Sequence, residues 1–167
     1  KSADGGEHWE AKRNGFPPVE LYGFSAPIAS LGVDPNSPNI IYAGIGDSRM
    51  GCHGQGTIYK SLDGGESWSI VNAGTLKLDP EALIYSIAVD PTDSDVLYVG
   101  TDKGLYKSTD GGVNWTSKNS GLPHTDTRTV IIDPTDPLTL YLTIHAPPSE
   151  TPWRGGVYKS TNGGGNW

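Results

Sequence analysis

The sequence predicts an all-β fold built from a repeated unit. One segment occurs four times with the pattern Ser-x-Asp/Asn-Gly-Gly-x-x-Trp, and an apolar run that ends in Asp-Pro occurs three times. The 23 glycines and 13 prolines are many for a chain of 167 residues, and they separate short apolar runs. Tight turns between such runs are typical of strands rather than helices. Four copies of one pattern indicate a repeat protein.

The fourfold segment has the features of a β-hairpin turn, and we call it the Gly-Gly turn. Asp followed by Gly is a strong hairpin signal, because glycine adopts positive φ without a Cβ clash. The Ser hydroxyl and Asp carboxylate can accept hydrogen bonds from turn amides, and the Trp supplies a large apolar surface. In the last copy Asn keeps the acceptor oxygen but not the charge, so we expect the turn to survive. The predicted structural residues are Ser2, Asp4, Trp9, Ser61, Asp63, Trp68, Ser108, Asp110, Trp115, Ser160, Asn162 and Trp167.

The three Asp-Pro runs predict the first strand, A, of each repeat. They cover residues 28–35, 84–91 and 129–134, and are apolar or small at nearly every position. A strand without polar alternation is expected to be buried on both faces. The proline ends the strand because it lacks the donor that a ladder needs.

Three further strands complete each predicted repeat. Strand B covers residues 40–44, 96–100 and 138–142, strand C runs into the Gly-Gly turn as in 104–108, and strand D begins at its Trp as in 115–118. The four turn serines are 59, 47 and 52 residues apart. Four antiparallel strands in a period of about 40–50 residues are what a β-propeller blade requires. The predicted fold is therefore a β-propeller segment of four-stranded antiparallel blades.

The predicted blades divide the chain into four parts. Residues 1–27 form the turn and last strand of a preceding blade plus a connection. Residues 28–83 form a blade with a long B–C loop, 84–126 one with a short B–C loop, and 127–167 one with a long B–C loop and an incomplete last strand. A closed ring needs roughly four to eight blades, and soluble proteins avoid open sheet edges. We expect a fragment of a longer propeller, partnered by its remaining blades or by another subunit, with self-association into a six-blade ring as the weaker alternative.

Composition and charge exclude several classes of partner. A net charge of −7 argues against a nucleic-acid partner, which would require a basic patch. No apolar run approaches the roughly 18–20 residues of a membrane span, and the N-terminus has no signal-peptide pattern. We expect no cofactor. Cys52, His53 and His145 match no metal-ligand spacing, and turn capping accounts for the acidic residues of the Gly-Gly turns without an ion.

The Gly-Gly turn resembles the Asp-box, or BNR, repeat of sialidase-like β-propellers. The stretch from Val89 to Trp115 is especially similar to bacterial BNR-repeat proteins, and resembles the propellers of xyloglucan hydrolases, sortilin and a photosystem II assembly factor. The resemblance covers essentially the whole chain. It implies Asp-box hairpins between strands C and D, on the face away from the active site, and an extracellular, cell-surface or periplasmic location. It is poorly specific for function, since one fold hosts many sites.

Candidate functional residues lie in the two long B–C loops, which carry nine more residues than the short one. In a four-stranded meander these loops emerge opposite the Gly-Gly turns, and loops that vary on a repeated scaffold often carry function. Trp and Arg beside carboxylates suit a sugar or peptide ligand. The ligand-binding candidates are Asp47, Arg49, His53, His145, Trp153 and Arg154, and the weak catalytic candidates are Asp47 and Glu150.

Three functions remain open. The leading hypothesis is a non-catalytic binding or structural module of a larger secreted or cell-surface propeller. The second is a glycoside hydrolase of the sialidase or xyloglucanase type, which would need a pair of carboxylates at a defined separation. The Phe/Tyr-Arg-Ile-Pro motif of the resembled sialidases is absent from this sequence, and only four arginines are present. The third is a sortilin-like peptide-binding propeller.

Overall fold

The computed structural model describes residues 1–16, 28–45, 56–71, 82–147 and 154–167. All regular secondary structure in these ranges is β, as predicted, and no helix long and apolar enough to span a membrane occurs among them. The strands form three antiparallel sheets, each in the order of the chain. The first sheet contains β1 (Ile28–Val33), β2 (Ile41–Ile45), β3 (Ile58–Ser61) and β4 (Ser69–Ile70). The second contains β5 (Ile84–Val89), β6 (Leu97–Thr101), β7 (Gly104–Ser108) and β8 (Thr116–Ser117). The third contains β9 (Thr127–Ile132), β10 (Leu140–Ile144) and β11 (Gly156–Ser160).

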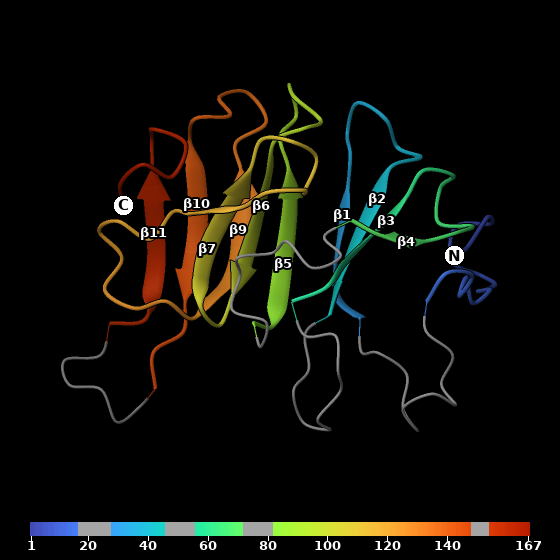
Figure 1. Cartoon of the computed structure of the whole chain (residues 1–167), viewed down its shortest axis with the longest axis horizontal. Helices are drawn as coiled ribbons and strands as arrows, with labels where there is room; N and C mark the ends of the chain where they lie inside the picture. The colour runs from blue at the N-terminus through green and yellow to red at the C-terminus, as the bar shows by residue number, and fades with distance from the viewer. Residues whose placement is uncertain (17–27, 46–55, 72–81, 148–153) are drawn as a thin grey trace.

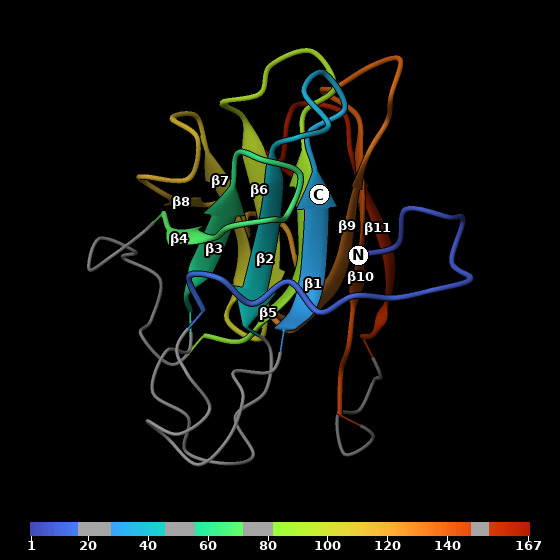
Figure 2. The ribbon, with the colours of Figure 1, turned by 90° about the vertical axis from the view of Figure 1, so that its right-hand side faces the viewer.

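The three sheets follow one another along the molecule, from the blue-green first sheet to the orange-red third (Figure 1). Their first strands, which we call the inner strands, pack directly against one another, β1 on β5 and β5 on β9. In Figure 2, β1 and β9 lie away from the last strands β4 and β8, which are at the left. The core lies mainly between the sheets. One cluster joins residues of the first and second sheets, and another joins the second and third. Burial between neighbouring units is how a repeat protein acquires a core. The boundaries at residues 27, 83 and 126 stay predictions.

The inner strands are buried less evenly than predicted. Only β5, which has a sheet on either side, lacks exposed residues; β1 and β9 alternate between buried and exposed positions. The expectation of burial on both faces is therefore wrong for β1 and β9, because each contacts a neighbouring sheet on one face. Strand B also begins one or two residues later than predicted. Residues 37–40 and 136–139 close a turn, through Ile40 N–H to Ser37 O at 2.7 Å and Thr139 N–H to Asp136 O at 2.8 Å.

The A–B turns and the Gly-Gly turns of the three sheets occupy the same end, uppermost in Figure 1, which we call the turn end. In each of the three sheets, the first glycine of the Gly-Gly turn donates to the A–B turn. Gly64 N–H binds Asn39 O at 2.8 Å, Gly111 N–H binds Asp95 O at 2.9 Å, and Gly163 N–H binds Leu138 O at 2.8 Å. The opposite end, where β9 begins and β10 ends, is the loop end.

Neighbouring sheets pack closely because glycine on one meets a bulky side chain on the next. A Cβ on Gly44 of β2 would lie 2.5 Å from Ile84 Cγ2, and a Cβ on Gly32 of β1 would lie 2.8 Å from Ile87 Cγ2. Neither glycine has a positive φ, so packing rather than backbone conformation favours glycine here. Between the second and third sheets Gly100 faces Thr127 in the same way.

Each inner strand contains one β-bulge near its start. The pairing register shifts between Ile28 and Ser30 in β1, between Ile84 and Ser86 in β5, and between Thr127 and Thr129 in β9, where their β10 partners are Ile144 and Thr143. The extra residues are Ala29, Tyr85 and Arg128, each six positions before the proline of its Asp-Pro. A bulge redirects a side chain and is often found beside functional sites.

Candidate functional site

The structure describes two of the predicted loop residues, His145 and Arg154. The other five, Asp47, Arg49, His53, Glu150 and Trp153, lie outside the described residues. Arg154 is exposed, and its carbonyl accepts a hydrogen bond from Tyr158 Oη at 2.8 Å. His145 follows β10 directly and is held at the loop end by Asp126, as described next.

Asp126 fixes both the backbone and the side chain of His145. His145 N–H donates to Asp126 O at 2.8 Å, and His145 Nδ1 lies 3.1 Å from Asp126 Oδ2. A carboxylate beside Nδ1 favours the tautomer that carries its proton there, which leaves Nε2 as an acceptor. The imidazole remains accessible, since 55% of the His145 side chain is exposed.

The same carboxylate holds Arg128 in a two-pronged ion pair. Arg128 Nε lies 2.7 Å from Asp126 Oδ1, and Nη2 donates to Oδ2 at 2.8 Å. The Asp126 side chain is 15% exposed and that of Arg128 is 42% exposed, so the pair is buried on the acid side and open on the other. Burial acts to lower the pKa of Arg128, but the hydrogen bonds and charge of Asp126 outweigh it and raise that pKa. Fork-shaped pairs of this kind fix the guanidinium plane.

Arg128 also joins the second and third sheets. Its guanidinium carbon lies 4.0 Å from the centre of the Tyr85 ring, which is close enough for a cation–π interaction. Tyr85 and Arg128 are the bulged residues of β5 and β9, so the two bulges turn their side chains toward each other across the sheet boundary. The equivalent residue of β1 is Ala29, which has no side chain of comparable reach. We call Tyr85, Asp126, Arg128 and His145 the loop-end cluster.

Further polar groups surround the loop-end cluster. His124 Nδ1 accepts a hydrogen bond from Asp126 N–H at 3.2 Å. Asp102 accepts one from Leu83 N–H at 2.7 Å and lies 3.3 Å from Lys103 Nζ. Both described carboxylates at this end are therefore engaged with neighbouring groups.

The loop-end cluster can supply hydrogen-bond donors from side chains that neighbouring groups hold in place. Arginine carries five N–H groups, of which one on Nη2 donates to Asp126 Oδ2, while Nε lies at ion-pair distance from Oδ1. The remaining N–H groups of Arg128 and Nε2 of His145 belong to partly exposed side chains. Donors and an acceptor beside an aromatic ring suit a ligand rich in hydroxyl groups. Asp126 orients this set, with Oδ2 accepting a hydrogen bond from Arg128 and Oδ1 at ion-pair distance from its Nε.

Sequence reasoning found His145 and Arg154 but not Tyr85, Asp126 or Arg128. These three lie on or just before inner strands, whereas the prediction looked only in the long loops. A signal was present, because Tyr85 and Arg128 stand at the same distance before successive Asp-Pro pairs. A large polar side chain at a strand position that otherwise holds an apolar or small residue indicates a role other than packing.

The Gly-Gly turns share one hydrogen-bond pattern at the opposite end. In the second sheet Ser108 Oγ donates to Asp110 Oδ1 at 2.8 Å and accepts from Gly112 N–H at 2.9 Å. Asp110 also accepts from the backbone and side chain of Asn114, at 2.8 and 2.7 Å. These bonds from Asn114, more than that from Ser108, lower the pKa of Asp110. Asn162 repeats the bonds to Ser160 and to the Asn166 N–H in the last turn.

The pKa of Asp4 in the first turn falls to about 2, mainly through the His8 backbone N–H and then through the hydroxyl of Ser2. Asp4, Glu7 and His8 bring three potential ligand atoms within 4.8 Å of one another, all on exposed residues. His8 Nδ1 already lies 2.6 Å from Asp4 Oδ2. The Ser, Asp and His groups of this turn thus bind one another, which is what a capped turn requires.

Comparison with known proteins establishes the fold. No known family profile matches the chain, and no curated protein sequence matches it. Among solved structures the chain is similar to a GH74 enzyme from Niastella koreensis, at 28% identity and a TM-score of 0.64, over 83% of this chain and 22% of that chain. It is also similar to the GH74 xyloglucanase from Xanthomonas campestris, at 20% identity and a TM-score of 0.61, over 84% of this chain and 23% of that one.

A third match is YCF48 bound to D1 peptide, at 17% identity and a TM-score of 0.56, over 85% of this chain and 40% of that chain. The two matches below 25% identity show the fold alone. These structures are β-propellers, so the predicted fold class is confirmed. The chain spans less than half the length of each of these matched chains and corresponds to part of a larger propeller.

Proposed function

We propose that this chain is a non-catalytic glycan-binding part of a larger β-propeller, and that the loop-end cluster is its binding surface. The observation that carries the proposal is the position of Arg128, fixed between the Asp126 carboxylate and the Tyr85 ring. A guanidinium held on two sides by neighbouring groups is already oriented before a ligand arrives, which reduces the entropic cost of binding.

The chemistry of the loop-end cluster favours a sugar. Sugar hydroxyl groups both donate and accept hydrogen bonds, and the cluster offers guanidinium donors together with an imidazole acceptor. With neutral His145 the cluster carries no net charge, because Asp126 balances Arg128. The 28% identity to a GH74 enzyme supports a glycan as the ligand class.

The described residues favour binding over catalysis. Glycoside hydrolysis requires an acid and a nucleophile or base, most often two carboxyl groups. At the loop end Asp126 is paired with Arg128 and His145, and Asp102 with Lys103 and the Leu83 N–H. Both described carboxylates at this end are thus engaged in contacts within the protein, which favours a binding surface over a catalytic pair.

A GH74-type glycoside hydrolase is the alternative, favoured by the same 28% identity. Its weak catalytic candidates, Asp47 and Glu150, are still predictions. The likeness to the peptide-bound YCF48 structure, at 17% identity, gives no support to a sortilin-like peptide site beyond the shared fold. For either glycan function we propose a location outside the cytoplasm, as part of a secreted or cell-surface protein, because extended glycans are found there.

Calorimetric titration with xyloglucan and cellulose oligosaccharides tests the proposal. The wild-type chain should bind at least one of them, and Arg128→Gln or Tyr85→Ala should weaken binding by about tenfold or more, since each removes a charge-assisted or stacking contact. Thr109→Ala, an exposed change at the turn end, serves as the matched control. Release of reducing ends from the same oligosaccharides, lost in Asp47→Asn or Glu150→Gln, would support the hydrolase and reject the non-catalytic binding module. Equal affinities of wild-type and Arg128→Gln chains would reject the loop-end cluster as the surface.

A further inference from the structure

Two hollows beside Gly-Gly turns occupy equivalent places in different repeats. One, of about 220 Å³, is lined by Lys107, Thr109, Asn114, Thr116 and Lys118 of the second sheet. The other, of about 400 Å³, lies in the N-terminal hairpin and includes Lys1, Ala3, His8, Glu10 and Lys12 in its lining. In both, one lysine directly precedes the turn serine and the other follows the turn tryptophan by three residues. The two hollows are therefore versions of one site.

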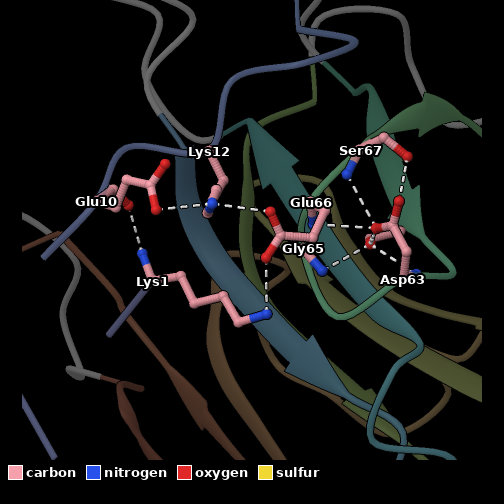
Figure 3. A network of polar contacts seen from close by, with 8 residues as sticks. Lys1, Glu10, Lys12, Asp63, Gly65, Glu66 and Ser67 are labelled. Carbon is pink, nitrogen blue, oxygen red and sulfur yellow. Dashed lines mark hydrogen bonds and ion pairs between the residues drawn. The ribbon is translucent and has the colours of Figure 1, made fainter. Parts of the chain in front are cut away.

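In the N-terminal hairpin, carboxylates neutralise both lysines (Figure 3). The Glu66 carboxylate bridges them, with Oε1 at 2.9 Å from Lys1 Nζ and Oε2 at 2.8 Å from Lys12 Nζ. Glu10 adds a second contact to Lys12 at 2.8 Å. The hydrogen bond from Lys12, and then that from Lys1, lowers the pKa of Glu66. Glu66 belongs to the next Gly-Gly turn along the chain, so an acidic side chain from a neighbouring turn fills this hollow.

In the second sheet both carboxylates are replaced. Thr116 stands where Glu10 does, and Gly165 of the next Gly-Gly turn stands where Glu66 does. Within the described part of the chain, neither Lys107 nor Lys118 forms an ion pair, although Lys107 Nζ lies 5.1 Å from the centre of the Tyr98 ring. The hollow thus combines two ammonium groups with threonine hydroxyls and the amide of Asn114.

The first sheet provides an internal contrast. Its equivalent positions hold one lysine, Lys60, with Val71 in place of the second and Val113 in place of Glu66. Asp110, the acid of the Gly-Gly turn in the second sheet, is no substitute for Glu66, because its carboxylate binds Ser108 and Asn114 of its own turn. The second sheet is therefore distinguished by a pair of lysines with glycine, Gly165, at the position of the bridging glutamate.

We propose that this hollow binds an acidic side chain of a protein partner, with its carboxylate bridging Lys107 and Lys118 as Glu66 bridges Lys1 and Lys12. The occupant of the N-terminal hollow is a glutamate on a β-turn, and Gly165 places no side chain at the corresponding position. An acidic segment of polypeptide fits this geometry. The site lies at the opposite end of the sheets from the loop-end cluster, so the two can be tested separately.

Nuclear magnetic resonance titration with an acetylated and amidated tetraglutamate peptide tests this proposal, with tetraglutamine and tetragalacturonate as comparison probes. Tetraglutamate should shift the side-chain methylene signals of Lys107 and Lys118 saturably, and added salt should weaken the effect. Lys107→Gln and Lys118→Gln should each lower the affinity about two- to fivefold, as expected for exposed ion pairs. Lys60→Gln is the matched control and should leave the affinity unchanged.

Gly165→Glu is the decisive variant because it restores the internal carboxylate. Gly165 has no positive φ, and the equivalent positions of the other turns hold Glu7, Glu66 and Val113, so the turn should tolerate the change with a small shift of Asn162, which lies 3.1 Å from the added Cβ. We expect this variant to lose tetraglutamate binding, with the Lys107 and Lys118 signals already at their bound positions. Undiminished binding by Gly165→Glu, or equal binding of tetraglutamine, would overturn the proposal. Tighter binding of tetragalacturonate than of tetraglutamate would show that the ligand is an acidic glycan instead, and would overturn the assignment to a protein partner.

Discussion

Tyr98 Oη donates a hydrogen bond of 3.2 Å to the carbonyl of Gly163, which lies in the Gly-Gly turn of the next sheet. Lys107 of β7 is the cross-strand partner of Tyr98 in β6. Its Nζ lies 3.7 Å from the position that a Cβ on Gly163 would take. The Gly-Gly turn therefore does more than reverse the chain. Through the Gly163 carbonyl it is also a contact point for the preceding sheet.

The hydroxyl group of Tyr98 should stabilise the contact between the second and third sheets. Tyr98 is buried, and we expect Tyr98→Phe to lower the free energy of unfolding by about 1 kcal/mol, the usual contribution of one hydrogen bond. Tyr42 is the equivalent residue of the first sheet, and among the described residues its buried hydroxyl has no partner. Tyr42→Phe should therefore be neutral or slightly stabilising. Urea unfolding of both variants measures the difference, and equal losses would show that the Gly163 contact contributes nothing.

Close packing between sheets should make Gly44 intolerant of even one methyl group. A Cβ there would lie 2.5 Å from Ile84 Cγ2 and 2.6 Å from Ser30 Oγ. We expect Gly44→Ala to cost about 1–3 kcal/mol of unfolding free energy through overpacking.

Gly156 of β11 is the matched control for Gly44, since a Cβ there would have its nearest neighbour 3.9 Å away, at Tyr158 Cε2. Gly156→Ala should be neutral, or stabilise by up to about 1 kcal/mol because the unfolded chain loses conformational freedom. The midpoints of urea denaturation compare the two variants. If both glycines tolerate alanine equally, the sheets are less closely packed than described.

Acid should weaken the Gly-Gly turns that contain aspartate. The pKa of Asp4 is about 2 against an ordinary 3.8, and that of Asp110 is also lowered. A carboxylate whose pKa is lower in the folded chain than in the unfolded chain stabilises the fold at pH values above the unfolded pKa, near 4. This stabilisation is lost as the pH falls toward 2. The turn with Asn162 has no such dependence. We therefore expect Asp110→Asn to reduce the drop in melting temperature between pH 7 and pH 3.

Asn162→Asp is the reciprocal test, because it introduces a titrating carboxylate into the last turn. It should enlarge the difference in melting temperature between pH 7 and pH 3, provided that the introduced carboxylate forms the same hydrogen bonds as that of Asp110. Differential scanning calorimetry at the two pH values compares both variants with the wild type. An unchanged pH difference in both would show that these carboxylates do not couple to folding.

Asp126 should act on ligand binding through the residues that it positions. Asp126→Asn removes the charge that holds Arg128 and His145. We expect glycan affinity to fall about three- to tenfold, less than in Arg128→Gln, because Arg128 itself remains. Calorimetric titration measures the affinities. A loss as large as that of Arg128→Gln would indicate that Asp126 contacts the ligand directly.

The sequence was sufficient to predict the fold because each repeat carries its own turn chemistry. Asp/Asn-Gly-Gly follows β3, β7 and β11, and the Asp-Pro pairs at 34–35, 90–91 and 133–134 follow β1, β5 and β9, so their spacing predicts the number of strands in a blade. The exact starts of strands were harder to predict from the sequence. Leu138 and Thr139 are residues common in strands, but Thr139 closes a turn with Asp136.

The loop-end cluster could not be derived from periodicity alone. Tyr85 and Arg128 are 43 residues apart in the sequence and meet only because a bulge turns each side chain toward the sheet boundary. A bulge leaves no strong signal in a strand of apolar and small residues. The second-sheet lysine pair was similarly hidden, because its meaning appears only when the repeats are compared position by position and Glu66 is seen to correspond to Gly165.

The most direct test of the central claim is to locate a bound glycan by nuclear magnetic resonance. The signals to follow during titration with a xyloglucan heptasaccharide are Arg128 Nε–H, the Tyr85 ring and, at the opposite end, Trp115 Nε1–H. If the loop-end cluster binds glycans, the Arg128 and Tyr85 signals shift saturably with one affinity while that of Trp115 stays in place. Shifts confined to Trp115 and its turn, with Arg128 and Tyr85 unmoved at saturation, would contradict the account.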